Sequence, residues 1–504
     1  MNHRLNDLFR SGMPDISSPA KGTGRRLFPT RKVVHMSMLG FAFLLPFLSW
    51  IQAAGAALLA LLFNLFILPS LGVDLRKSPN KSGKVGNGEM GKSFQPSFRR
   101  FSIFPFALLP RSCSKVPGSA GEEADADVWR GIILYPISVL ALILVYRHSL
   151  HVVGAAWAIM ALGDGMASVA GEALAGPALL YNPEKTWPGF GAFVLAGTVG
   201  AYVLTRWGNP AIPPRNALIV SAAAALVGAL VESLPIRLDD NLSVPLVCGG
   251  FMFCILLTEQ AAFWSNWPYL KLRIWLAIGI NLVLALTALG LRLVTRSGAA
   301  AGSVLGVAVY LGYGYKSFLL LLAFFALGSA ATRSGYKRKA ARAVAERRGG
   351  ARSWREAVAN TSVAAFFALL VVTTLHEAAF LLALVAALAE AAGDTVSSEI
   401  GQWLSPRAYL ITSLKPVRAG EDGGVSWGGT AAGLGASAVV VGLGYSLGLC
   451  SRSGAALALS AAVAGNLLDS LLGATLEQRG LVTNDVVNFA GTSFAGALAL
   501  GLSL

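Results

Sequence analysis

The stretch MSMLGFAFLLPFLSWIQAAGAALLALLFNLFILPSL, residues 36–71, decides the fold class because it contains no charged side chain. Comparable apolar runs recur at 131–146, 217–231, 274–291 and 431–449. A helix needs about 20 apolar residues to cross a bilayer, so these and similar runs indicate about 12 to 15 transmembrane helices. The short alternating strands typical of a membrane barrel are not found in the sequence. We therefore predict an all-α, polytopic integral membrane protein.

The charge pattern agrees with this class. Charged residues make up only 13% of the 504 positions, too few for a water-facing surface. The net charge of +15 does not indicate nucleic-acid binding, because Lys and Arg lie in short stretches between apolar runs. By the positive-inside rule these stretches face the cytoplasm. We expect a multi-pass protein of a bacterial inner membrane with its active sites on the cytoplasmic side.

Polar residues recur with one spacing in the two halves of the chain. In each half an aspartate is followed by a serine after four positions, a glycine after seven and a lysine after 21. The first set is Asp164, Ser168, Gly171 and Lys185, and the second is Asp394, Ser398, Gly401 and Lys415. A further polar cluster follows at nearly the same distance, with Asp240 and Asn241 in the first half and Asn466, Asp469 and Ser470 in the second. We interpret this as a duplication or a distant homology of the two halves.

The repeat suggests a domain organisation of two related helical bundles. We predict a polar, basic tail at 1–30 and two membrane domains, at 31–265 and 270–504. Residues 78–128, rich in Ser, Lys, Gly and Pro, are expected to form a flexible loop within the first domain. The loop contains Gly86, Gly91, Lys92 and Ser93, which fit the phosphate-loop pattern GxxxxGK[ST]. Neither flank can form the required strand or helix, so we reject this motif.

The shared residues have the chemistry of phosphoryl transfer. Asp164 and Asp394 lie in apolar runs, where an ionisable residue is costly and is a functional candidate by default. The alternative is an aspartate that only hydrogen-bonds a neighbouring helix. Carboxylates can hold Mg²⁺, and a lysine near the membrane surface can neutralise phosphate oxygens. The candidate metal ligands are Asp164, Asp240, Asp394 and Asp469.

Several long motifs carry a resemblance to known families. The first half contains RKVVH at 31–35, GDGMASVAG at 163–171, NPEKTWPG at 182–189 and DDNLSVPL at 239–246, and it resembles the CTP-dependent polyprenol kinases, which include phytol and dolichol kinases. The second half contains GDTVSSEIG at 393–401 and NLLDSLLGATLEQ at 466–478. It resembles phytyl-phosphate kinase and its relatives, catalogued as domain of unknown function 92.

The resemblance implies two successive phosphorylations, of a prenyl alcohol and then of its monophosphate, with CTP and Mg²⁺ in the first step. It implies that Asp164 and Asp240 hold the metal, that Lys185 binds the triphosphate, and that His35 or a carboxylate orients the alcohol. The second half can use CTP or another nucleoside triphosphate. The catalytic candidates are His35, Asp164, Lys185, Asp240, Asp394, Lys415 and Asp469. The candidates for binding nucleotide or phosphate are Arg31, Lys32, Ser168, Gly171, Glu184, Lys185, Asn241, Lys339, Ser398, Lys415, Asn466 and Ser470.

Other functions fit parts of the pattern. Duplication and intramembrane carboxylates also mark tandem-repeat transporters, whose sites lie near the membrane midplane. A membrane cytidylyltransferase would share CTP and lipid substrates but release pyrophosphate. Physical chemistry alone favours a role for Arg31, Lys32 and His35 as a positive-inside anchor. One half could also be an inactive scaffold.

Overall fold

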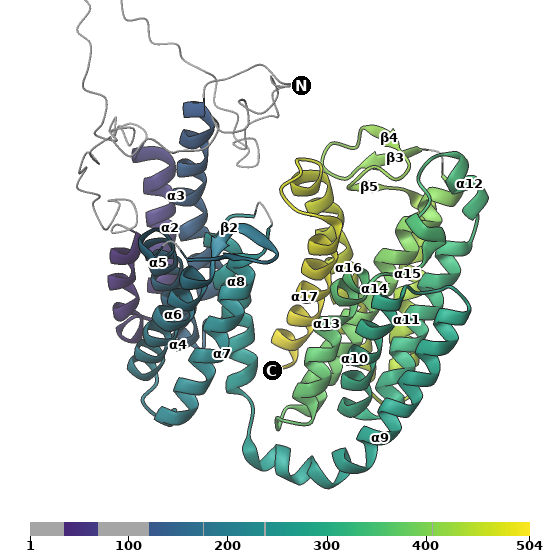
Figure 1. Cartoon of the computed structure of the whole chain (residues 1–504), viewed down its shortest axis with the longest axis horizontal. Coiled ribbons are helices and arrows are strands. Elements are labelled where there is room, and N and C mark those ends of the chain that lie inside the picture. Colours follow the sequence, from purple (N-terminus) through teal and green to yellow (C-terminus); the bar gives the residue numbers. More distant parts are fainter. Residues whose placement is uncertain (1–34, 69–119, 175, 236–237, 406) are drawn as a thin grey trace, which may run out of the picture.

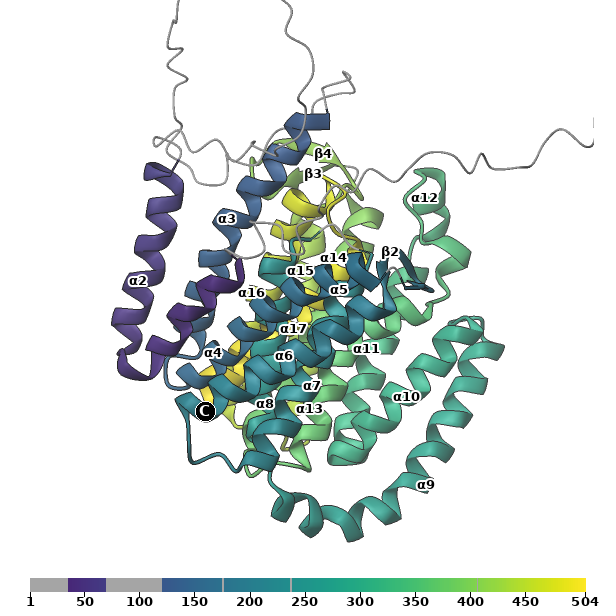
Figure 2. The same ribbon diagram turned by 60° about the vertical axis from the view of Figure 1, so that its left-hand side comes forward.

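The structure is a computed structural model that describes residues 35–68, 120–174, 176–235, 238–405 and 407–504. The expected tail, Arg31, Lys32, the rejected phosphate-loop pattern and most of the expected loop lie outside these ranges. The described residues form two helical bundles that stand side by side, joined by one long helix (Figures 1 and 2).

The N-terminal bundle consists of helices with one short hairpin between them. In chain order its elements are η1 (Met38–Phe47), α2 (Trp50–Leu62), η2 (Phe63–Ile67), α3 (Ala120–Val145), α4 (Leu150–Ala158), η4 (Ile159–Asp164), α5 (Gly165–Leu174), β1 (Ala178–Leu179), β2 (Asn182–Thr186), α6 (Trp187–Gly208), α7 (Pro214–Ser233) and α8 (Asp240–Leu256). The segments α4, η4 and α5 follow one another without a break and make a single apolar span, Leu150–Leu174.

The long helix α9 (Gln260–Gly290) leads from α8 to the C-terminal bundle. That bundle contains α10 (Arg296–Tyr313), α11 (Tyr315–Arg333), α12 (Tyr336–Ala341), η5 (Arg347–Gly350), α13 (Trp354–Val371), α14 (Glu377–Leu404), β3 (Arg407–Leu410), β4 (Pro416–Arg418), β5 (Gly424–Val425), α15 (Trp427–Ser446), α16 (Arg452–Leu472), η6 (Gly473–Glu477) and α17 (Asn484–Ser503).

The helices confirm the predicted fold class. Ten of the described helices are long and apolar enough to cross a membrane. Three shorter apolar helices accompany them, at His35–Phe47, Gly131–Val145 and Asp240–Leu256. The number of candidate spans within the described residues therefore reaches the predicted 12 to 15 only when these shorter helices are counted.

One helix at the centre of each bundle is buried on nearly all sides. In the C-terminal bundle this helix is α14, which packs against α11, α13, α15, α16 and α17. Its residues 379–393 are all buried, and a helix that is apolar all round belongs in such a place. In the N-terminal bundle α4 and η4 have this position, with residues 152–161 buried. Each central helix carries the aspartate of the repeat.

The two bundles share a detailed packing unit around the helix that follows each hairpin. Thr186 caps α6 by accepting a hydrogen bond from the Gly189 N–H, and Ser426 caps α15 by accepting one from Gly429. A methyl group on Gly171 would lie 3.1 Å from Thr186 Oγ1, and one on Gly401 would lie 3.0 Å from Ser426 Oγ. The same two helices therefore meet through the same small residues in both halves.

This packing unit gives the register between the halves. Gly401 lies 230 positions after Gly171, whereas Ser426 lies 240 positions after Thr186. The connection in the second half is thus ten residues longer. It contains a three-stranded sheet in the order β4-β3-β5, whereas the first half has the two-stranded hairpin β1-β2. Neither sheet was predicted from the sequence.

The bundles contact each other near the start of α9. Glu259 donates its backbone N–H to Thr373 O at 2.8 Å, and Asn266 Nδ2 donates to Val372 O at 3.1 Å. The rings of Phe251 and Phe366 stack with centroids 5.7 Å apart. The domain division predicted between residues 265 and 270 falls inside α9, and it stays a prediction.

Candidate functional site

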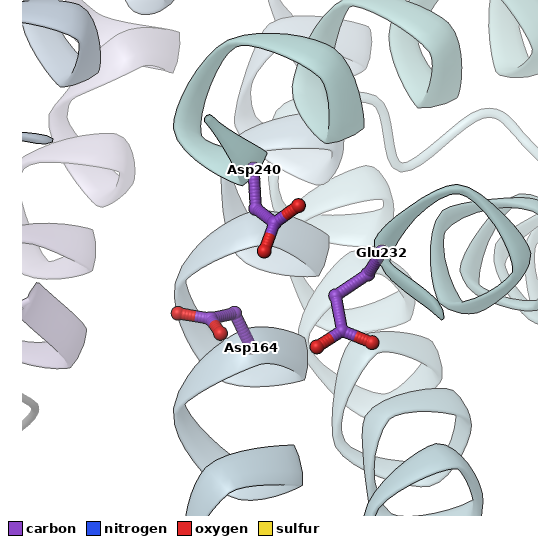
Figure 3. Close-up of side chains that lie close together, drawn as sticks. All are labelled: Asp164, Glu232 and Asp240. Carbon is purple, nitrogen blue, oxygen red and sulfur yellow. The ribbon is translucent and has the colours of Figure 1, made fainter. Parts of the chain in front are cut away.

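Three carboxylates converge at one end of the N-terminal bundle (Figure 3). Asp164 comes from the end of η4, Glu232 from the last turn of α7, and Asp240 from the first turn of α8. One oxygen of each lies within 4.8 Å of the other two. Among the described residues only this group brings three possible metal ligands so close together. We call it the carboxylate triad.

A lysine balances the charge of the triad. Lys185 Nζ forms an ion pair with Glu232 and lies 3.8 Å from Asp240 Oδ2. Burial alone would lower the pKa of Lys185, but the carboxylates of Glu232, Asp240 and Asp164 outweigh burial and leave this pKa above its usual value. The lysine therefore stays protonated at neutral pH, and its charge is available to an anionic ligand.

Lys185 is placed over the triad by the hairpin that carries it. Its strand β2 pairs with β1 in antiparallel fashion, with Ala178 opposite Thr186. The buried Asn182 donates from Nδ2 to Ser233 O at 3.0 Å, and the Tyr181 and Ser233 hydroxyls lie 2.8 Å apart. Ser233 directly follows Glu232, so these hydrogen bonds fix the hairpin to the end of α7. The hairpin that carries Lys185 is thus tied to the helix that carries its ion-pair partner, Glu232.

A histidine approaches the triad from another helix. His35 Nε2 lies 3.9 Å from Asp164 Oδ2. The imidazole packs edge-on against the ring of Tyr135, with centroids 4.9 Å apart, and the Tyr135 hydroxyl accepts a hydrogen bond from Trp157 Nε1. An imidazole oriented in this way beside a carboxylate can accept a proton from a substrate hydroxyl.

Four other predicted residues of the first half lie around the triad. Ser168 is one helical turn after Asp164, and Gly171 makes the close packing to Thr186 described above. Glu184 is exposed and donates its backbone N–H to Asn182 Oδ1 at 3.1 Å. Asn241 donates both its backbone N–H and its Nδ2 to Asp239 Oδ1, at 2.9 and 2.8 Å. Its side-chain amide therefore takes part in capping α8.

The second half has its own buried acidic cluster. Asp394 on α14 and Asp469 on α16 are close enough to influence each other electrostatically, and Asp469 Oδ2 is buried without a hydrogen-bond partner among the described residues. One turn before Asp394, the Glu390 side chain is fully buried, and neither of its oxygens has a hydrogen-bond partner among the described residues. Gly465 and Gly491 make room for it, because a methyl group on Gly491 would lie 2.4 Å from Glu390 Oε1.

The structural register differs from the spacing used in the sequence analysis. In each half the helix that follows the capped helix ends with a buried carboxylate, because Glu232 lies in the last turn of α7 and Asp469 in the last turn of α16. Asp469 therefore corresponds to Glu232 on α7 and not to Asp240. At the head of α17, Asn484 and Asp485 take the place of Asp240. Equal spacing along the chain concealed this correspondence, because the connection between the central helix and the capped helix is ten residues longer in the second half.

Lys415 does not occupy the place of Lys185. It is exposed, just before β4. Lys185 directly precedes Thr186, the cap of α6, and Val425 directly precedes Ser426, the cap of α15. Val425 is therefore the counterpart of Lys185. Of the remaining candidates in this half, Ser398 is exposed, Asn466 donates from Nδ2 to Ala462 O at 3.3 Å, and Ser470 is half-buried.

Lys339 serves as an internal anchor, which corrects the prediction that it binds phosphate. The side chain is fully buried and forms an ion pair with Glu399 on α14. Its ammonium also donates to Thr332 O at 2.8 Å and to Ala331 O at 3.2 Å. These three acceptors use all three N–H donors of the lysine, so none is left for a phosphate.

Two residues of these clusters were not predicted, Glu232 and Glu390. Glu232 is the one carboxylate of α7, at ALVES, and Glu390 lies in the buried apolar stretch of α14, at ALAEAAGD, four residues before Asp394. The signal that could have found them is the same one that identified Asp164, because an ionisable residue within an apolar span needs a reason to be there.

Comparison with known proteins separates the two halves. The model of the family described as integral membrane protein DUF92 matches residues 279–496. An uncharacterized membrane protein of Synechocystis is 37% identical over 234 residues, which cover 45% of this chain and 91% of that protein. The chloroplastic protein VTE6 of Arabidopsis thaliana is 35% identical over 213 residues, 41% of this chain and 64% of that protein.

The N-terminal half has a weaker and partial match. Phytol kinase 1, a chloroplastic protein of Arabidopsis thaliana, is 29% identical over 153 residues. This match covers 29% of the chain and about half of the relative, 48% of its length. No solved structure matches the chain significantly.

Proposed function

Because this chain belongs to the DUF92 family of integral membrane proteins through its C-terminal half, we propose that it is a membrane-embedded kinase of isoprenoid lipids. The N-terminal half transfers the γ-phosphoryl group of CTP to a prenyl alcohol such as phytol. The C-terminal half then phosphorylates the prenyl monophosphate to the diphosphate. The partial similarity to phytol kinase 1 supports the first step, and the motifs that resemble phytyl-phosphate kinase support the second.

The observation that carries the proposal is the carboxylate triad with Lys185 beside it. Oxygen ligands of this kind suit Mg²⁺, which is held by one or two carboxylates together with substrate phosphates. Asp164, Glu232 and Asp240 would hold the ion, and their closeness fits it. When bound, Mg²⁺ neutralises charge on the triphosphate. Lys185, already ion-paired within the triad, exchanges its carboxylate contacts for phosphate oxygens.

The substrate hydroxyl needs a proton acceptor, and His35 is the group placed to provide it. The alcohol oxygen forms a bond to the γ-phosphorus of CTP while the bond from that phosphorus to the bridging oxygen breaks. CDP leaves with the bonding electron pair. The hydroxyl proton passes to His35 Nε2, and the nearby Asp164 carboxylate stabilises the resulting imidazolium.

The position of the triad favours a kinase over a transporter. Glu232 and Asp240 lie at the ends of α7 and α8, and Lys185 lies in a hairpin outside the helices. A soluble nucleotide and a membrane lipid can both reach such a place, at the end of a bundle. A transport site of the repeat type lies instead near the midplane, between broken helices.

The test uses membranes containing the full chain, with phytol, farnesol or geranylgeraniol, Mg²⁺ and γ-labelled CTP or ATP. Wild-type protein is expected to give labelled monophosphate and diphosphate. Asp394→Ala should accumulate monophosphate, and Asp164→Ala should give no labelled lipid from an alcohol but still phosphorylate added monophosphate. If folded wild-type protein labels no lipid with any alcohol or triphosphate, the kinase proposal is wrong and transport becomes the better hypothesis.

A further inference from the structure

The C-terminal half has no lysine where the first half has Lys185, yet one cation approaches its acidic cluster from another direction. Arg352 precedes α13, and its guanidinium acts electrostatically on Asp394. Its Nη2 lies 2.7 Å from the position that a methyl group on Gly328 would take, and Thr395 Cγ2, next to Asp394 in the chain, lies 3.2 Å from the same position. Gly328 of α11 therefore leaves the space through which the arginine reaches α14.

The backbone of Arg352 is held independently of its side chain. Its N–H donates to Leu293 O at 3.0 Å, and its carbonyl oxygen accepts from the Thr295 N–H, also at 3.0 Å. The segment therefore stays in place whatever the side chain does. A purely structural role for the guanidinium is not needed to hold this part of the chain.

The guanidinium itself has unused hydrogen-bonding capacity. It stacks 5.8 Å from the ring centre of Phe324 and is half-buried. It makes no hydrogen bond or ion pair within the described part of the chain, so its five N–H donors are free. A half-buried, stacked arginine with a free planar fork is well suited to bind a phosphate group through two parallel hydrogen bonds.

We infer that Arg352 binds a phosphate group beside Asp394 and Asp469 and takes in the C-terminal half the part that Lys185 has in the N-terminal half. The ligand is a phosphate ester, either the terminal phosphates of a nucleoside triphosphate or the head of a prenyl monophosphate. The binding site stands on the geometry of Arg352, and only the identity of its ligands rests on the proposed function. Lys415, matched to Lys185 by spacing alone, has no such part.

The test measures equilibrium binding to purified full-length protein that carries Asp164→Asn, so that the first site is disabled. Labelled CTP and ATP with Mg²⁺ form one arm, and labelled phytyl monophosphate forms the other. Arg352→Ala should lower the binding affinity for the ligand whose phosphate contacts Arg352 by roughly 10- to 150-fold. This is the effect of losing a hydrogen bond to a charged group. Arg352→Lys keeps the charge but loses the fork, and should fall in between.

Three further variants make the result specific. Arg338→Ala removes an exposed arginine of α12 at the same end of the bundle and should bind both ligands like the parent protein. Lys415→Ala should also bind normally. Gly328→Ala places a methyl group against Arg352 Nη2 and should weaken binding while Arg352 is still present. Thermal unfolding of each variant shows that the protein is folded.

Binding by Arg352→Ala at the parent affinity in both arms would overturn the inference. The inference would also be overturned if neither the nucleoside triphosphates nor phytyl monophosphate bound to the folded parent protein. Arg352-dependent binding without transfer of label to phytyl monophosphate would contradict the proposed second phosphorylation and leave the phosphate site established. The two conclusions can therefore fail separately.

Discussion

Glu232 offers the sharpest test of the triad, because the repeat did not point to it and the structure places it against Lys185. The substitution Glu232→Gln keeps the size of the side chain and removes its charge. It leaves Lys185 with only the more distant Asp240, at 3.8 Å. It also removes one of the three oxygen ligands proposed for the metal.

The size of the effect follows from the exposure of the pair. A hydrogen bond between charged groups contributes about 1.5–3 kcal/mol. The Glu232 side chain is only 6% exposed but that of Lys185 is 32% exposed, so solvent screening favours the lower end of the range. A loss of about 1.4 kcal/mol of transition-state stabilisation lowers the rate about tenfold. Loss of a metal ligand adds to this, so we expect kcat/KM for the alcohol to fall at least tenfold.

The assay is the initial rate of alcohol phosphorylation at several concentrations of CTP and Mg²⁺. Glu232→Gln should need more Mg²⁺ for half-maximal rate, a change that a merely structural role would not produce. Glu172→Gln is the matched control, because Glu172 is an exposed glutamate of α5. A change of less than twofold in folded Glu232→Gln protein, or an equal loss in Glu172→Gln, would contradict the proposed role of Glu232.

Two further predictions concern the C-terminal half. Lys339→Met leaves Glu399 as an unpaired buried charge and should destabilise the protein by about 3–5 kcal/mol, as measured by denaturant unfolding in detergent. The double variant with Glu399→Leu should recover much of this stability. No recovery would contradict the anchor role of Lys339. Glu390→Met copies the first half, where Met160 stands at the matching position of the central helix, and should leave folding intact. It should lower phosphorylation of the monophosphate about tenfold or more if Glu390 supports metal binding, as losing a group next to a metal site typically does; an unchanged rate and Mg²⁺ requirement would count against that role.

The fold class could be predicted from the sequence because a bilayer accepts few kinds of structure. Uncharged runs such as 36–71 must form helices there, since every backbone polar group needs a partner within its own segment. The two small sheets lie outside the spans, where water satisfies exposed backbone groups. Sequence there is only weakly constrained, so the sheets were not predicted.

The first-half cluster was largely predictable, and the second was less so. Asp164, Lys185, Asp240 and His35 belong to long motifs, and the structure brings them together. Equal spacing assigned Lys415 and Asp469 to the wrong counterparts, because ten extra residues lie between Gly401 and Ser426. Arg352 could not be found from the repeat, because it lies just before α13, outside the positions that the two halves share.

Both hairpin regions lie at the same end of the molecule, with β2 over one bundle and β3 to β5 over the other (Figure 1). For the two phosphorylations proposed above, a lipid head group that leaves the first cluster would stay in the same leaflet as the second. Its travel would then be lateral diffusion in two dimensions over a molecular width, with no flip-flop across the hydrocarbon and no carrier through water.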